Sequence, residues 1–421
     1  MEDSKHYSQF RWAVLGLISI VTICAAITMM SFAPLMGVIA KDLETNVGSA
    51  TFGLMGLNML AMAIGCAVSG YLLDRFGVFP VINCGMVLLI AGHALMPWLG
   101  HSYWPTVAIR VVEGIGAAPV FVAIGPAVAR WFPPQEAGTA IGLQSVAITA
   151  GNLFGLIAAP RLALSRSWQN SMAWLSVGMA VALVIVIALS VMAEKRSPAE
   201  PVVASSTPTQ AGVSKLVINR PFLVGLLGMC CGIWTMQAFM SLAPGYLAVA
   251  PPVGVGFGPM VAGKLMMAVL LSGMVASLVG GVLVDRVFGG KCWPVVLTGF
   301  AMIAVCVVLL VMPQIYHHQA ALVLSLVLVG AGTPFINPVL MVFAAKIFPH
   351  SVVGRVVGSW MSIGLFSGAA GVMVASAALR STGNYRLSME TISVVAVAGI
   401  VVALFLYRAE SDPTSCSESK V

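Results

Sequence analysis

The sequence predicts an all-α integral membrane protein with twelve transmembrane helices, arranged as two six-helix bundles. Composition is the first observation: 59% of the residues are hydrophobic and only 8% are charged. A soluble domain carries about 25% charged residues, so most of this protein's surface is expected to face a lipid bilayer. The second observation is a series of twelve long apolar runs, and the third is a repeat that relates the two halves of the chain.

Each apolar run is long enough to cross a bilayer as one helix, which takes about 20 residues. Backbone groups in lipid must bond within their own segment, so each run is expected to be helical. Asn337-Pro338, close to Pro334, predicts a break in the tenth helix, and Pro119 and Pro126 predict breaks in the fourth. The first six runs cover residues 12–38, 50–73, 78–98, 104–131, 138–160 and 171–193. The second six cover residues 221–249, 260–284, 292–312, 319–347, 354–379 and 388–407.

The chain is expected to fold as two halves joined by a linker. Residues 194–218 are rich in Pro, Ser and Thr and have no apolar period, which is typical of a flexible cytoplasmic connection. This boundary gives an N-terminal half over residues 1–193 and a C-terminal half over residues 219–408. The polar residues 409–421 are predicted to form a disordered tail.

The Lys and Arg residues predict the orientation in the membrane, because cytoplasmic loops carry an excess of them. Of the 21 Lys and Arg residues, 14 flank one side of the predicted spans, two lie inside helices, and five flank the other side: Lys41, Arg161, Arg166, Arg380 and Arg386. We therefore expect both termini in the cytoplasm, in a multi-pass protein of the cell inner membrane. The protein is also expected to be monomeric. The bias also accounts for the net charge of +7, so no nucleic-acid partner is needed.

A short polar motif recurs at the same place in the two halves. Gly70, Asp74, Arg75 and Gly77 follow the second apolar run. Their counterparts after the eighth run are Gly281, Asp285, Arg286 and Gly289. The pairs Phe132-Pro133 and Phe348-Pro349 and the pairs Gly114-x-Gly116 and Gly330-x-Gly332 recur in the same order. Parallel six-helix repeats are typical of transporters in which one half rocks against the other.

Together with Arg110-x-x-x-Gly114-x-Gly116 on the fourth helix, the repeated motif resembles the major facilitator superfamily. The resemblance covers the whole chain and implies the fold of that family. It also implies transport by alternating access, with Asp74 and Asp285 acting beside Arg75 and Arg286 as a cytoplasmic latch. The alternative is a surface turn with an ion pair that contributes little to stability.

Two charged residues lie inside the predicted fourth helix. Arg110 and Glu113 share one face because of their i, i+3 spacing, and charges inside a membrane usually line a cavity or pair with each other. Their counterparts in the second half are Leu326 and Val329, so the scaffold does not require charge there. We interpret Glu113 as a group that takes up and releases a proton, with Arg110 as its partner; the alternative is a static ion pair.

Uncharged polar residues inside the helices are candidates for substrate binding, although each could equally form a hydrogen bond between helices. Lys264 either reaches the membrane interface or offers a positive charge to an anionic substrate. His93, His101, His317 and His318 fall near loops or helix ends and are expected at the surface. The candidate substrate-binding residues are Asn58, Gln144, Asn152, Gln237, Lys264 and Asn337.

The predicted function is proton-coupled transport of a small organic solute. Two bases within helices against one acid favour an anion such as a carboxylate. Drug efflux is the alternative, since a Met-rich cavity with few charges suits lipophilic substrates, and a transporter-like sensor or assembly factor is the alternative of another class. No metal-ligand spacing or catalytic constellation is present, so neither an enzyme nor a cofactor is expected.

Overall fold

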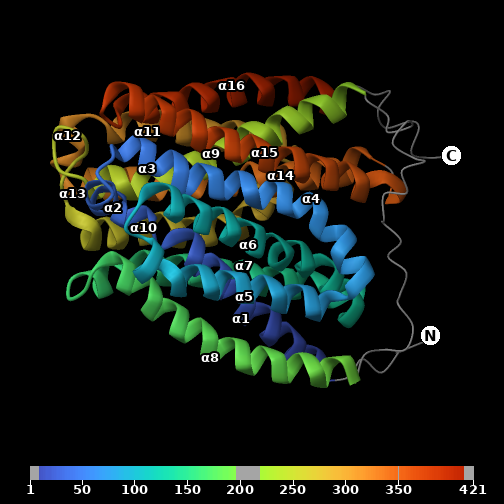
Figure 1. Ribbon diagram of the computed structural model, residues 1–421. Helices are drawn as coiled ribbons and strands as arrows, with labels where there is room; N and C mark the ends of the chain where they lie inside the picture. Colours follow the sequence, from blue (N-terminus) through green and yellow to red (C-terminus); the bar gives the residue numbers. More distant parts are fainter. Residues whose placement is uncertain (1–8, 196–218, 349, 412–421) are drawn as a thin grey trace. The chain divides into compact units, whose positions relative to one another are not determined.

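The computed structural model describes residues 9–195, 219–348 and 350–411 (Figure 1). Within those residues, twelve helical segments are long and apolar enough to cross a membrane. The predicted all-helical fold with twelve spans is therefore confirmed. The chain divides into two compact units, Met1–Ser205 and Ser206–Val421.

In the first unit, the second span is not a regular α-helix along its whole length. It contains a π-helical turn, η2 (Phe52–Leu57), between α3 and α4. π-turns are rare and are frequently found at functional sites. The bounds of the other helices are α1 (Phe10–Met30), α2 (Met36–Asp42), α3 (Val47–Thr51), α4 (Asn58–Phe76), α5 (Val78–Leu99), α6 (Tyr103–Trp131), α7 (Pro134–Ala163) and α8 (Trp168–Lys195).

In the second unit, α9 packs against α15 and α16, and α11 packs against α13 and α16. The bounds are α9 (Arg220–Ala248), α10 (Gly258–Val282), α11 (Trp293–Leu310), α12 (Pro313–Tyr316), α13 (Gln319–Gly332), α14 (Asn337–Ile347), α15 (His350–Thr382) and α16 (Arg386–Ser411). A π-helical turn, η4 (Leu283–Val287), follows α10.

The helix breaks predicted from proline are confirmed in the second half and wrong in the first. The tenth span is broken as predicted, because α13 ends at Gly332 and α14 begins at Asn337 with Pro338 in its first turn. The predicted breaks in the fourth span are wrong, because α6 is one helix through Pro119 and Pro126. In a membrane bundle, neighbouring helices stabilise a helix around its missing backbone hydrogen bonds.

The predicted linker and tail fall mainly outside the described residues. The first two linker residues, Glu194 and Lys195, continue α8. The first three residues of the predicted tail, 409–411, continue α16. The rest of both segments lies beyond what the structure describes.

Two pairs of glycines bring helices together at corresponding places in the two units. A Cβ on Gly85 would lie 2.5 Å from the carbonyl oxygen of Gly116, and a Cβ on Gly116 would lie 2.8 Å from that of Gly85. In the second unit, Gly299 and Gly332 face each other in the same way at 2.7 and 2.8 Å. Only glycine leaves room for backbones this close, so these pairs fix α5 on α6 and α11 on α13.

Candidate functional site

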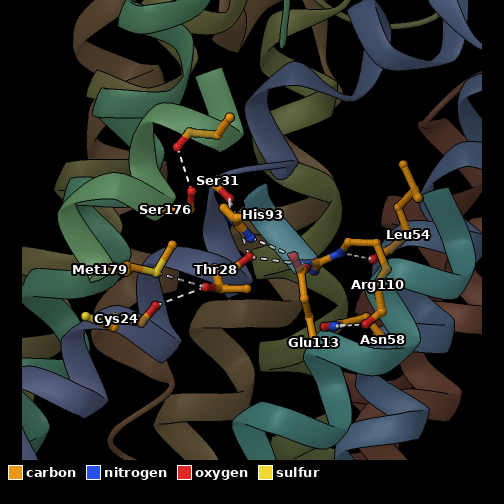
Figure 2. Close-up of polar contacts among 11 residues, drawn as sticks. Cys24, Thr28, Ser31, Leu54, Asn58, His93, Arg110, Glu113, Ser176 and Met179 are labelled. Carbon is orange, nitrogen blue, oxygen red and sulfur yellow. Dashed lines mark hydrogen bonds and ion pairs between the residues drawn. The ribbon is translucent and has the colours of Figure 1, made fainter. Parts of the chain in front are cut away.

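The centre of the first unit contains a charged pair on α6. Arg110 Nη1 donates a hydrogen bond to Glu113 Oε2 at 2.6 Å, and both side chains are 0% exposed (Figure 2). Their spacing of three residues places them one turn apart on the same face of the helix. Gly92 on α5 makes room for the carboxylate, because a Cβ there would lie 2.5 Å from Glu113 Oε1. The predicted pairing of these residues is therefore present.

The guanidinium of Arg110 is held by backbone carbonyls from two other spans. Nε donates to the carbonyl oxygen of Leu54 at 2.9 Å, and Nη1 donates to that of Thr28 at 3.1 Å. The ring of Phe32 lies 4.3 Å from the guanidinium carbon, a cation–π distance. Nη2 is buried and has no hydrogen-bond partner in the described chain. The site therefore has one cationic donor left to offer to an acceptor.

The π-turn η2 supplies part of this arrangement. Leu54 lies within the turn, and its carbonyl accepts the hydrogen bond from Arg110 Nε. Asn58, the first residue after the turn, donates its side-chain amide to the carbonyl oxygen of Arg110 at 2.7 Å. Hydrogen bonds thus run in both directions between the second span and residue 110. This reciprocal contact couples the shape of η2 to the position of the charge.

His93 is the third member of the cluster, and the expectation that it lies at the surface is wrong. Its side chain is 0% exposed, and its Nδ1 lies 2.6 Å from Glu113 Oε1 (Figure 2). A signal was available in the sequence: His93 falls at helical spacing with Met86, Leu89 and Met96, which are all buried. His101, His317 and His318, which were also expected at the surface, are exposed.

The corresponding place in the second unit is apolar. Leu326 and Val329 occupy the positions of Arg110 and Glu113 in the repeat, and both are buried on α13. Buried hydrocarbon side chains alone can therefore fill this position of the repeat. Helix packing at this position of the repeat therefore does not by itself require charged residues.

The predicted substrate-binding residues, which are five amides and Lys264, lie in different environments. Asn58 is buried against α6, as described above. Gln144 is also buried, and its amide nitrogen donates to Ser19 Oγ at 2.9 Å while its oxygen accepts from Thr22 at 3.2 Å, so it connects α7 to α1. Asn152 and Gln237 are half-buried, and Lys264 is exposed. Asn337 is half-buried, with a side-chain oxygen that has no partner in the described chain.

The predicted gating motif forms the end of the second span. Gly70 lies within α4, and Gly77 ends this helix with a φ of +85°, a backbone conformation that favours glycine. Asp74 and Arg75 are exposed, and Arg75 Nη1 donates to the hydroxyl of Tyr71 at 2.9 Å. In the other unit, Gly281 lies in α10 and Asp285 in η4, while Arg286 is exposed. Gly289, which corresponds to Gly77, also has a positive φ, of +56°.

Across the described ranges, no group of three or more His, Cys, Asp and Glu side chains is placed to hold a metal ion. The buried cluster of Arg110, Glu113 and His93 brings together one guanidinium, one carboxylate and one imidazole. We call it the α6 cluster below.

Comparisons with known proteins agree with this fold. The family description "Major Facilitator Superfamily" matches residues 18–318 and again residues 247–420. A relative from Xenopus tropicalis, "Solute carrier family 49 member A3", is 26% identical over 352 residues, covering 80% of this chain and 71% of that protein. The "Gentisate transporter" of Corynebacterium glutamicum is 23% identical over 325 residues, covering 76% of this chain and 71% of that protein.

A solved structure gives the same result for the fold. The crystal structure of a D-xylose-proton symporter superposes with a TM-score of 0.71 at 14% sequence identity, covering 95% of this chain and 98% of that one. At this identity, the likeness concerns the arrangement of the helices.

Proposed function

Because this chain belongs to the Major Facilitator Superfamily and is a multi-pass membrane transporter rather than an enzyme, we propose that it carries a small organic anion together with a proton. The observation that carries the proposal is the α6 cluster. A fully buried Arg110–Glu113 pair lies where the second unit has Leu326 and Val329. Ionisable residues inside a membrane are costly, and they usually mark ion or substrate pathways.

The charges of the α6 cluster support coupling between a proton and an anion. An ionised Arg110 and an ionised Glu113 cancel, so the cluster with a neutral His93 has no net charge. One added proton gives it a charge of +1, which an anionic substrate would compensate. The unpaired Arg110 Nη2 offers a donor to such an anion. Proton and anion therefore favour each other's binding, as symport requires.

The choice of a carboxylate has one further support. The relative from Corynebacterium glutamicum is named a gentisate transporter. Gentisate is an organic anion. We propose this class of substrate for the present chain, moved by alternating access in an inner membrane with both termini cytoplasmic. Asp74 and Asp285 act as a latch on the cytoplasmic side of this cycle, and Asn152, Gln237, Lys264 and Asn337 are the remaining candidate contacts for the substrate.

The proposal is tested by proton movement in reconstituted vesicles that hold a pH-sensitive dye. The probes are gentisate, benzoate and other carboxylates, inorganic anions, and lipophilic cations. We expect carboxylates to drive proton entry in the wild-type protein and to lose this effect by about tenfold or more in Glu113→Gln and Arg110→Gln. Glu136→Gln is the matched control, because Glu136 is a carboxylate of the same unit that is paired with Arg11 outside the cluster.

Each alternative gives a different result in this experiment. Proton movement driven by lipophilic cations, and not by carboxylates, would favour drug efflux. Labelled gentisate that crosses without protons would mean uniport or exchange, and the Arg110–Glu113 pair would then be structural. A protein that moves no probe would support a sensor or assembly factor.

A further inference from the structure

His93 closes a ring of hydrogen bonds around the α6 cluster. Glu113 accepts from Arg110 through Oε2 and contacts His93 Nδ1 through Oε1. On the other side of the imidazole, Nε2 lies 3.4 Å from Ser31 Oγ, and this hydroxyl also lies 3.4 Å from the carbonyl oxygen of Thr28. The same carbonyl accepts from Arg110 Nη1 at 3.1 Å, which completes the ring (Figure 2).

The ring accommodates two protonation states of His93 with the same positions of the heavy atoms. In the neutral state, Nδ1–H donates to Glu113 and the lone pair of Nε2 accepts from the hydroxyl of Ser31. In the cationic state, Nε2–H donates to Ser31 Oγ, and the hydroxyl hydrogen turns toward the carbonyl of Thr28. A serine hydroxyl is both donor and acceptor, and its hydrogen rotates to suit its neighbours. In both states, the two ring nitrogens of His93 and the hydroxyl of Ser31 have hydrogen-bond partners.

The charged groups that face His93 belong to α6. Glu113 contacts it directly, and Arg110 lies on the far side of the carboxylate. The helices α1, α4 and α8 also pack against α5. At this level, α1 contributes Thr28 and Cys24, and α8 contributes Ser176 and Met179, which are all uncharged (Figure 2). The charged residues of these three helices lie at their ends: Arg11 on α1, Asp74 and Arg75 on α4, and Glu194 and Lys195 on α8.

We propose that the transported proton is carried on His93 Nε2, with Glu113 as the fixed counterion and Ser31 as the hydroxyl that switches between the two states. On the acidic side, an O–H bond of hydronium breaks as its proton forms an N–H bond at Nε2. On the other side, the N–H bond breaks and the proton returns to water. This assignment rests on the proposed function, because it locates the proton within the same cluster. It makes His93 a proton-binding residue that neither the sequence motifs nor the comparisons indicate.

The direct test is nitrogen NMR of the full chain in lipid nanodiscs with [15N]histidine. The His93 signals are assigned by their absence in His93→Gln, since Gln retains a donor to Glu113 and does not titrate. If that variant does not fold, a variant with Gln at the other five histidines assigns them instead. We expect His93 to be protonated at Nδ1 alone at high pH and at both nitrogens at low pH. In Ser31→Ala the chemical shift of Nε2 should change more than that of Nδ1, because the hydroxyl that contacts Nε2 is removed. Exposed His101 is the internal reference.

The transport experiment separates this inference from the proposed function. We expect His93→Gln to lose pH-driven accumulation of gentisate by about tenfold, whereas Glu136→Gln, the control outside the cluster, stays within about threefold of wild type. A His93 that keeps one protonation form from pH 5 to pH 9 would overturn the inference, and so would full accumulation by His93→Gln. Loss of proton movement in Glu113→Gln would leave the proposed function standing in either case. Retention of proton movement there would overturn both.

Discussion

Glu113 contacts two basic side chains on two different helices. Arg110 comes from its own helix, α6, and His93 comes from α5. Breaking a buried ion pair by removing one partner costs about 3–5 kcal/mol, since the other charge is left uncompensated. Replacing both partners with well-packed apolar residues is often neutral. Single and double substitutions therefore distinguish the cost of an orphaned charge from the value of the pair.

The second unit provides the residues for such a test. Replacing Arg110 with Leu and Glu113 with Val installs the residues found at 326 and 329. We expect Arg110→Leu alone to lower the thermal midpoint in detergent by several degrees and the double variant to recover most of that loss. The double variant should nevertheless show no proton-coupled flux in vesicles. Wild-type coupling in the double variant would mean that the pair has no part in proton transfer.

At this scale, the sequence predicted the pair and not its third member. Arg110 and Glu113 are recognisable because charge is rare inside apolar runs. His93 has no formal charge and lies seven residues before Gly100, in a position that a loop could reach. Its helical spacing with Met86, Leu89 and Met96 indicates a buried face. Its contact with Glu113 depends on the packing of α5 against α6, a tertiary feature that no local pattern specifies. Arg110's bonds to the Leu54 and Thr28 carbonyls were equally beyond prediction, because they depend on the π-turn and on the neighbouring span.

Among the elements, α5 and α6 are positioned by the glycines at 85 and 116. Because each Cβ position faces a carbonyl oxygen of the other helix, a side chain there must separate the two backbones. The α6 cluster spans the same two helices, so this spacing also sets the distance between His93 and Glu113.

Gly116→Ala is expected to destabilise the protein by about 1–3 kcal/mol, the usual cost of overpacking. Gly125→Ala on the same helix is the matched control, because no atom lies within 4 Å of its Cβ position. Alanine is a better helix former than glycine, so the control should be neutral or stabilising. Unfolding in detergent, monitored by circular dichroism, measures the stability of both variants. Equal midpoints for the two variants would contradict the role of the close contact.

The turn after α4 gives a separate prediction about gating. Asp74 is exposed, and within the described residues it forms no ion pair. If it acts as a latch in another state of the cycle, Asp74→Asn should slow gentisate exchange several-fold while leaving expression and thermal stability unchanged. Glu390→Gln, which removes a half-buried carboxylate that pairs with Arg386 on α16, is the control. Unchanged exchange rates in Asp74→Asn would identify the motif as a surface turn.

For the molecule as a whole, the charge bias predicts which ends of the helices face the cytoplasm. In a variant without native cysteines, Ser102→Cys should react with a membrane-impermeant maleimide added to intact cells, because it lies between α5 and α6 on the predicted outer side. Phe76→Cys, at the exposed end of α4, should react only after the cells are permeabilised. The reverse pattern would invert the predicted orientation.

The twelve spans and the twofold repeat could be predicted because they depend on hydropathy and on spacing along the chain. The broken tenth span followed from Asn337-Pro338, where two signals coincide. The fourth span did not follow the same rule: Pro119 and Pro126 lie inside a helix that its neighbours on α4 and α5 stabilise. A proline lacks a backbone hydrogen-bond donor, and the packing around it determines whether the helix ends there.

The apolar pair Leu326 and Val329 has a consequence for energetics. Only the first unit has a buried ionisable cluster at this level of the described helices. Under the proposed mechanism, one protein would therefore carry one proton in each cycle. A single proton moving with a monovalent anion transfers no net charge across the bilayer. Transport would then respond to a pH gradient and would not depend on membrane voltage. Moving a net elementary charge across the membrane would instead change the transport free energy by about 2.3 kcal/mol per 100 mV. A potassium diffusion potential imposed with valinomycin should leave the initial rate of gentisate uptake unchanged, whereas a dicarboxylate would make the same carrier electrogenic.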